Sequence, residues 1–183
     1  MSVCSIPRKL LRARDGATAV EFAIIAPVVL LLSAGIMEFT ILMFDYHRAG
    51  EAARRGARIA SFQTAIGRLD NLADGATVTC SASGGGGVTC TNGPVVVDQT
   101  FFTILAAMRE IMPEIEGENL TVSYAPSGIG DITTPGGIKP RVTVELEGLE
   151  HDFILFGGFT GLPDSLLLPS FSTTVIGIGY STS

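Results

Sequence analysis

The chain has 183 residues, a formal net charge of −6 at pH 7 and 46% hydrophobic residues. This length suffices for one membrane helix and one domain of about 120 residues. After Arg58 there are thirteen acidic and four basic residues. Because a face that binds nucleic acid needs an excess of basic side chains, this composition argues against nucleic acid as a partner.

A short basic leader opens the chain and ends at Gly16, with Glu21 as the fifth residue after that glycine. Four bases precede the glycine: Arg8, Lys9, Arg12 and Arg14. Secretory signal peptides place their apolar core before the cleavage point, whereas here the apolar segment comes after it. A cut after Gly16 would leave the hydrophobic helix on the mature protein. We therefore expect residues 1–16 to be a cytoplasmic leader.

The apolar segment is long enough to cross a bilayer. From Phe22 to Phe44 its one charged residue is Glu38, and its helical length of about 34 Å exceeds a hydrocarbon core of about 30 Å. The alternative, a buried core helix, is disfavoured because such helices carry a polar stripe. We expect a helix over residues 17–61 that spans the membrane at about 22–44. Pro27 lacks a backbone donor, which predicts a transmembrane kink there.

Cys80 and Cys90 bracket the run CSASGGGGVTC. Strand-like residues flank glycines that can turn tightly, so we expect a hairpin closed by a disulfide that contributes about 2–3 kcal/mol. The alternative, a two-cysteine metal site, lacks further ligands, because His47 and His151 are not at ligand-like spacing. Cys4 lies in the leader. The modified cysteine of a lipoprotein follows an apolar region, and no apolar region precedes Cys4. A disulfide implies a compartment outside the cytosol.

The orientation of the span is inferred from the basic residues at its two ends and from the domain that follows it. The basic leader places the N-terminus in the cytoplasm by the positive-inside rule. Four arginines also follow the span, at positions 48, 54, 55 and 58, so the count of bases alone leaves the orientation open. The expected disulfide decides it, because the domain after the span then lies outside the cytoplasm.

The helix is expected to continue past the bilayer as an amphipathic extension. Small residues recur there at helical spacing: Ala49, Ala52, Ala53, Gly56 and Ala60. Such a stripe permits close approach of another helix or a sheet. One interpretation is a solvated amphipathic helix and the other a subunit-packing surface, and we favour the second.

Residues 62–183 are expected to form an acidic extracytoplasmic domain. A helix is predicted over Gln99–Met112, capped by Asp98 and ended by Pro113, with an apolar stripe that points to a core. Four strands are predicted at residues 120–124, 141–147, 151–156 and 171–180, with a loop over 128–140. The fold class is therefore α+β, with an antiparallel sheet and one packed helix after the long N-terminal helix.

No catalytic constellation stands out, so we expect no enzyme, no cofactor and no metal site. The tetraglycine Gly84–Gly87 lacks the Gly-Lys-Ser/Thr of a phosphate loop. His151 and Asp152 are neighbours on a strand, where successive side chains point to opposite faces. Three acids at positions 114, 116 and 118 follow a helix end, and their pattern favours a solvated turn over a calcium site.

The N-terminal third resembles the start of TadE-like pseudopilins, which are components of tight-adherence (Flp-type, type IV-like) pilus systems. The resemblance rests on Gly16, Glu21, Phe22, Pro27, Gly35, Glu38 and the segment Glu51–Ser61. A late segment with a Leu-Pro loop and a strand, LPDSLLLPSFSTTVIGIG, is also similar. The rest of the chain matches only loosely.

The resemblance implies cleavage by a prepilin peptidase between Gly16 and Ala17. It assigns recognition and assembly to Glu21 and Phe22, the acid pairing with the N-terminal amine of a neighbouring subunit. The alternative role of Glu21 is to cap the helix start and its dipole. Major pilins of this system are very short, so a chain with an added domain is expected to be a minor pilin.

The implied function is pilus biogenesis, adherence or secretion at the bacterial inner membrane, with the domain periplasmic or extracellular. The implied partners are the membrane, the prepilin peptidase, other pilins and pseudopilins, and the pilus assembly platform. The alternative function is that of an uncleaved single-pass membrane protein whose extracytoplasmic domain is a binding or adhesin module.

Overall fold

The computed structural model describes residues 15–70, 72, 75–129, 139–155, 157 and 163–177. Most of the expected leader (1–14, with Cys4), most of the expected loop (130–138) and the end of the last expected strand (178–180) lie outside the described residues. The described residues form an α+β fold in which a long N-terminal helix joins an antiparallel sheet and a second helix.

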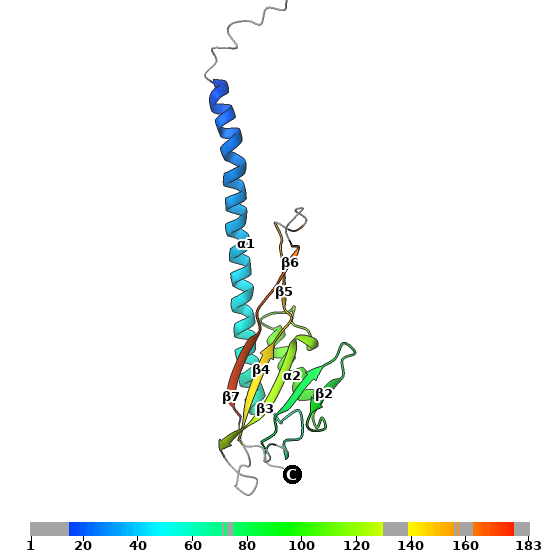
Figure 1. Cartoon of the computed structure of the whole chain (residues 1–183). Helices are drawn as coiled ribbons and strands as arrows, with labels where there is room; N and C mark the ends of the chain where they lie inside the picture. Colours follow the sequence, from blue (N-terminus) through cyan, green and yellow to red (C-terminus); the bar gives the residue numbers. More distant parts are fainter. Residues whose placement is uncertain are drawn as a thin grey trace, which may run out of the picture.

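One long helix, α1 (Asp15–Phe62), is the stem of the molecule, and its first half stands clear of the domain (Figure 1). It is the one helix among the described residues that is long and apolar enough to cross a membrane, and none of its most apolar window is buried. The alternative of a buried core helix is therefore wrong. Pro27 lies inside α1, which continues past it without a break; Figure 1 shows a gentle curve along the helix and no sharp kink.

Five antiparallel strands form the main sheet in the order β2-β1-β3-β4-β7. Their bounds are β1 Val78–Ala82, β2 Val88–Thr91, β3 Leu120–Ile129, β4 Lys139–Leu146 and β7 Phe171–Ile176. A separate two-stranded hairpin pairs β5 (Glu150–Asp152) with β6 (Ser165–Leu167). It lies between β4 and β7 in the chain and rises beside α1 (Figure 1).

Two helices cover one face of the main sheet. The second half of α1 and α2 (Asp98–Arg109) pack against each other, and α1 also packs on β4 and β7. Alternation along β3 and β4 turns Val122, Tyr124 and Val144 into this layer, where all three are fully buried. A short 3-10 helix, η3 (Gly117–Asn119), leads into β3.

The stripe of small residues on α1 belongs to this intramolecular core. Ala49, Ala52, Ala53 and Ala60 are buried in the hydrophobic cluster that the described residues form. At Gly56, an added Cβ would meet the Sδ of Met108 at 2.5 Å, so the glycine lets α2 approach closely. The favoured prediction of a subunit-packing surface at this stripe is therefore wrong, because the chain's own domain covers it.

Several element boundaries differ from the predictions. The second helix begins at Asp98 and ends at Arg109, so Met112 lies beyond it. Asp98 is a helical residue and not the cap; the capping position is Val97, without a side-chain hydrogen bond.

The strands also differ in length from the predictions. Pairing extends β3 to Ile129 and β4 back to Lys139, so the ends of the expected loop are strand. The strand expected over 151–156 is reduced to β5, and β6 was not predicted. The last strand ends at Ile176 within the described residues, before the expected end at 180.

Candidate functional site

The first half of α1 presents an apolar surface that no other described part of the chain covers. Its large side chains from Val20 to Phe44 are exposed nearly throughout. The predicted processing residues, Gly16 and Ala17, lie in the first turns and are exposed. An added Cβ at Gly16 would meet nothing within 4 Å. This end of the helix is therefore open to an enzyme or a neighbouring subunit.

Glu21 and Phe22 are also exposed on this free part of α1. No hydrogen bond or ion pair joins Glu21 to another described residue. A carboxylate in an apolar span is costly unless it is paired or reaches the interface. No described residue therefore competes with an outside partner for Glu21.

Glu38 is the exception on the exposed half of the helix, since it is only 3% exposed. Its two carboxylate oxygens accept hydrogen bonds from consecutive backbone N–H groups: Oε1 from Ile154 at 2.7 Å and Oε2 from Leu155 at 2.8 Å. Both donors follow β5 in the hairpin. Because backbone donors satisfy both oxygens, the acid can be buried at the end of an apolar span.

His151 lies beside Glu38 and Asp45 of α1 and is 4% exposed. Its Nδ1 is 2.8 Å from Oδ2 of Asp45, to which it donates because a carboxylate only accepts. Its Nε2 is 3.9 Å from Oε1 of Glu38, which is beyond hydrogen-bond distance. The ring also packs edge-on against Phe153. Two acids seven residues apart on α1 thus flank one histidine of the hairpin.

Arg48 extends this polar network to the end of α2. Its guanidinium is 3.5 Å from Asp45 and 3.6 Å from Glu114, and its Nε donates to the carbonyl of Ile111 at 2.9 Å. Glu114 is thereby engaged in an ion pair. Among the described residues, no group of three or more His, Cys, Asp or Glu side chains is arranged to hold a metal ion. The network joins three parts of the chain, namely α1, the hairpin and the segment after α2.

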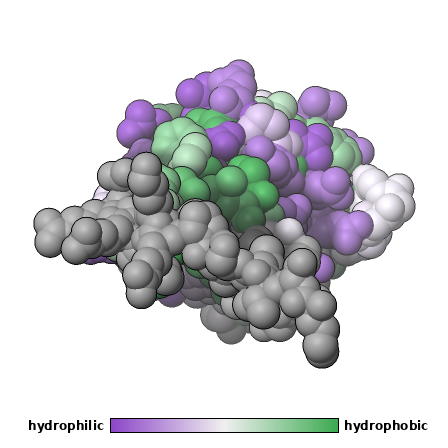
Figure 2. Space-filling model, turned by 90° about the horizontal axis from the view of Figure 1, so that it is seen from above, coloured by the Kyte–Doolittle hydropathy of each residue, from purple (hydrophilic) through white to green (hydrophobic). Residues whose placement is uncertain are grey.

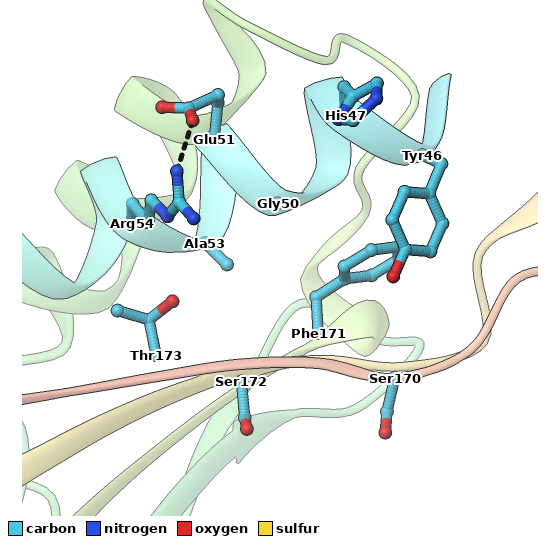
Figure 3. Close-up of a pocket in the computed structure, with 10 residues that line it drawn as sticks. All are labelled: Tyr46, His47, Gly50, Glu51, Ala53, Arg54, Ser170, Phe171, Ser172 and Thr173. Atoms are coloured by element: carbon cyan, nitrogen blue, oxygen red, sulfur yellow. Dashed lines mark hydrogen bonds and ion pairs between the residues drawn. The ribbon is translucent and has the colours of Figure 1, made fainter. Parts of the chain in front are cut away.

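An open cleft of about 390 Å³ lies between α1 and the edge strand β7 (Figure 3). At one end, Tyr46 packs edge-on against Phe171 with ring centroids 4.9 Å apart. At the other end, Arg54 pairs with Glu51 at 2.6 Å on the outer surface of the helix. The cleft thus has an aromatic pair at one end and an ion pair at the other.

The predicted cysteine pair lies on neighbouring strands. Cys80 of β1 and Cys90 of β2 are register partners, and their sulfur atoms are 2.00 Å apart, at disulfide bonding distance. Gly67 packs against the pair, since an added Cβ there would meet Sγ of Cys90 at 3.1 Å. The tetraglycine forms the turn of this hairpin, with Gly86 at φ +79°.

Residues 16–58 match the model of the family described as TadE-like protein. The chain carries a TadE-like segment. The segment begins at the predicted processing residue, contains Glu21, Pro27, Glu38 and Asp45, and ends within the helix extension. No curated protein and no solved structure matches the chain significantly. With the uncovered apolar half of α1, the TadE-like segment makes this a membrane-anchored protein.

The cluster of Glu38, Asp45 and His151 was not predicted as a site. In the sequence, Glu38 stands out only as the one acid of the span and as part of the TadE-like resemblance, and His151 is disfavoured both as a metal ligand and as part of a dyad. One signal was present: an acid inside an apolar helix implies a partner. That partner proved to be backbone N–H groups 116 and 117 positions away, which residue types do not reveal.

Proposed function

We propose that this protein is a pseudopilin of a tight-adherence pilus, processed by a prepilin peptidase after Gly16. In this proposal α1 is held in the inner membrane with its N-terminus cytoplasmic. The domain, with its cysteine pair, lies in the periplasm or outside the cell. The protein then acts in pilus assembly with other pilins, pseudopilins and the assembly platform. No enzyme activity is part of the proposal.

The observation that carries the proposal is the start of the TadE-like segment at Gly16, on a helix whose first half is uncovered. A helix of this kind can lie in lipid before assembly and against other helices after it, since both environments are apolar. Among the described residues, the hydrophobic core of the domain packs against the second half of α1, and the hairpin reaches α1 at Glu38. Processing at Gly16 would therefore remove the leader without disturbing the folded domain.

A test of processing replaces Gly16 by valine in cells that carry a prepilin peptidase. The expected result is loss of the shift to a shorter chain on an electrophoretic gel, because a small residue at the cleavage point is replaced by a β-branched one. An added Cβ meets nothing at this position, so folding is unaffected. Gly87→Val is the matched control, at a second glycine with open space around it, and is expected to be processed normally.

Equal processing of both variants would reject cleavage after Gly16. An uncleaved full-length chain in piliated cells would favour the alternative, a single-pass membrane protein with a binding or adhesin domain. In that case removal of residues 62–183 would abolish attachment while fibres remained normal.

The role of Glu21 is tested by Glu21→Gln. The expected result is a processed chain that no longer copurifies with other pilus subunits, because the amide lacks the charge needed to pair with a neighbour's amine. Copurification at the wild-type level would instead assign Glu21 to the dipole of its own helix.

A further inference from the structure

The hairpin of β5 and β6 exposes large apolar side chains that the domain leaves uncovered. Ile154 is 69% exposed and Leu167 63% exposed, and Leu155 and Leu166 are exposed as well. They stand on a part of the chain in which acidic residues far outnumber basic ones. Exposed apolar side chains grouped at one place on an otherwise acidic domain indicate a contact with another apolar environment.

The hairpin is held at a fixed height along α1. His151, on β5, bonds Asp45, whereas Ile154 and Leu155, further along the hairpin, bond Glu38. From Asp45 to Glu38 the helix rises by about 10 Å. The hairpin therefore runs along α1 toward the apolar half of the helix and away from the main sheet (Figure 1).

A span that begins at Ala17 places the membrane surface near Glu38. Ala17–Met37 comprises 21 residues with one charged side chain, Glu21 near its start, and a helix of this length spans about 31 Å, close to a hydrocarbon core of about 30 Å. Glu38 then lies at the edge of the core on the side of the domain. In this placement the span begins five residues and ends seven residues before the expected span of 22–44.

We propose that the β5–β6 hairpin inserts its apolar edge into the membrane surface beside α1. Ile154 and Leu155 lie at the level of Glu38, at the boundary of headgroups and acyl chains, and hold the domain against the bilayer. Seen from above, from the end at which α1 begins, apolar surface lies at the centre with hydrophilic surface beyond it (Figure 2). This proposal requires only that α1 spans a membrane and is independent of processing at Gly16.

The contact is apolar rather than electrostatic. The charged residues of the described hairpin are acidic, with Glu150 and Asp152 on β5 and Asp164 just before β6. Such residues do not attract anionic lipids. Binding of the hairpin to the membrane surface is therefore expected to be insensitive to salt and to the fraction of anionic lipid.

The test uses the full chain with Cys4→Ser, reconstituted into nanodiscs that contain phosphatidylcholine brominated near the headgroup end of the acyl chains. A fluorophore is attached at Ile154→Cys or, as the matched control, at Ile129→Cys. Ile129 is also apolar and 48% exposed but lies at the opposite end of the sheet, where β3 ends and β4 begins. We expect the label at position 154 to be quenched at least about twofold more than the control, since the apolar groups of an interfacial segment are buried about 5–10 Å into the boundary of headgroups and acyl chains.

A second variant tests whether the hydrogen bonds to Glu38 hold the hairpin at the membrane surface. Glu38→Ala removes the acceptor for both hairpin N–H groups and is expected to reduce quenching at position 154 while circular dichroism of the domain is retained. Equal quenching at 154 and 129 overturns the proposal. So does cross-linking of position 154 between two copies without quenching, which would make the hairpin a subunit contact. Quenching that disappears in high salt would equally contradict apolar insertion.

Discussion

Glu38 is the residue that holds the β5–β6 hairpin along α1, because its carboxylate accepts from two consecutive backbone N–H groups. Glu38→Gln retains the size of the side chain but leaves one oxygen for two donors. Loss of one hydrogen bond to a charged group costs about 1.5–3 kcal/mol. Hydrogen exchange at Ile154 and Leu155 is therefore expected to accelerate by about 10- to 100-fold, as measured by exchange mass spectrometry or NMR.

Thr40→Val is the control for this measurement. Thr40 lies two residues along the same helix, and among the described residues its hydroxyl bonds the carbonyl of Ile36 within α1, so its replacement is expected to leave exchange in the hairpin unchanged. If Glu38→Gln also left the exchange at Ile154 and Leu155 unchanged, these hydrogen bonds would not hold the hairpin.

Two glycines of α1 provide a matched pair of positions for testing how closely the helix is packed. An alanine Cβ at Gly50 would be in ordinary contact with Phe171 at 4.0 Å, whereas at Gly56 it would overlap Met108. Gly50→Ala is expected to raise the free energy of unfolding by about 0.5–1 kcal/mol through helix propensity. Gly56→Ala is expected to lower it by about 1–3 kcal/mol through overpacking.

Thermal or denaturant unfolding of the two variants in detergent measures both changes. Equal stabilisation by the two substitutions would show that α2 does not pack as closely on α1 as the structure indicates.

At the scale of elements, the cysteine pair links the edge strand β2 to β1. Replacing both Cys80 and Cys90 by alanine is expected to lower the free energy of unfolding of the domain by about 2–3 kcal/mol, because closing a short loop restricts the unfolded chain. The effect is measured by denaturant unfolding under oxidising conditions. Cys4→Ala, in the leader, is the control and leaves the midpoint unchanged. Identical midpoints for all three proteins would mean that the pair is reduced in the native state.

The elements differ in how far their sequence predicted them. Local patterns indicated α2, β3 and β4, because periodicity of apolar residues reports the buried face directly. The length of the apolar run likewise indicated α1. Of the β5–β6 hairpin, a strand was predicted at β5 and none at β6. Each strand is three residues long, and alternation of apolar and polar residues over three positions is too short to predict a strand.

The long-range contacts of the candidate site could not be predicted from the sequence, and the roles of its local residues stay predictions. Gly16, Ala17 and Glu21 follow from the order of leader, glycine and acid along the chain. The contacts of Glu38 with Ile154 and of Asp45 with His151 join residues more than 100 positions apart. The stripe of alanines was recognised as a packing surface, but the pattern of small residues does not distinguish a partner in the same chain from one in another.

At the scale of the whole molecule, the chain separates into an uncovered apolar stem and a domain fastened to its second half. The stem is available for lipid and then for neighbouring helices, while the polar network of Glu38, Asp45 and Arg48 fixes the domain just beyond it. In the proposed function, a chain built in this way is inserted, processed and assembled without unfolding. The leader is the part that must leave for the proposed assembly to begin.

Intact-mass and N-terminal peptide analysis of the protein from membranes of its own piliated cells tests this account most directly. The account predicts a mature chain that starts at Ala17, with the domain through Ser183 retained. A chain that still carries Met1 to Gly16 in such cells would contradict it.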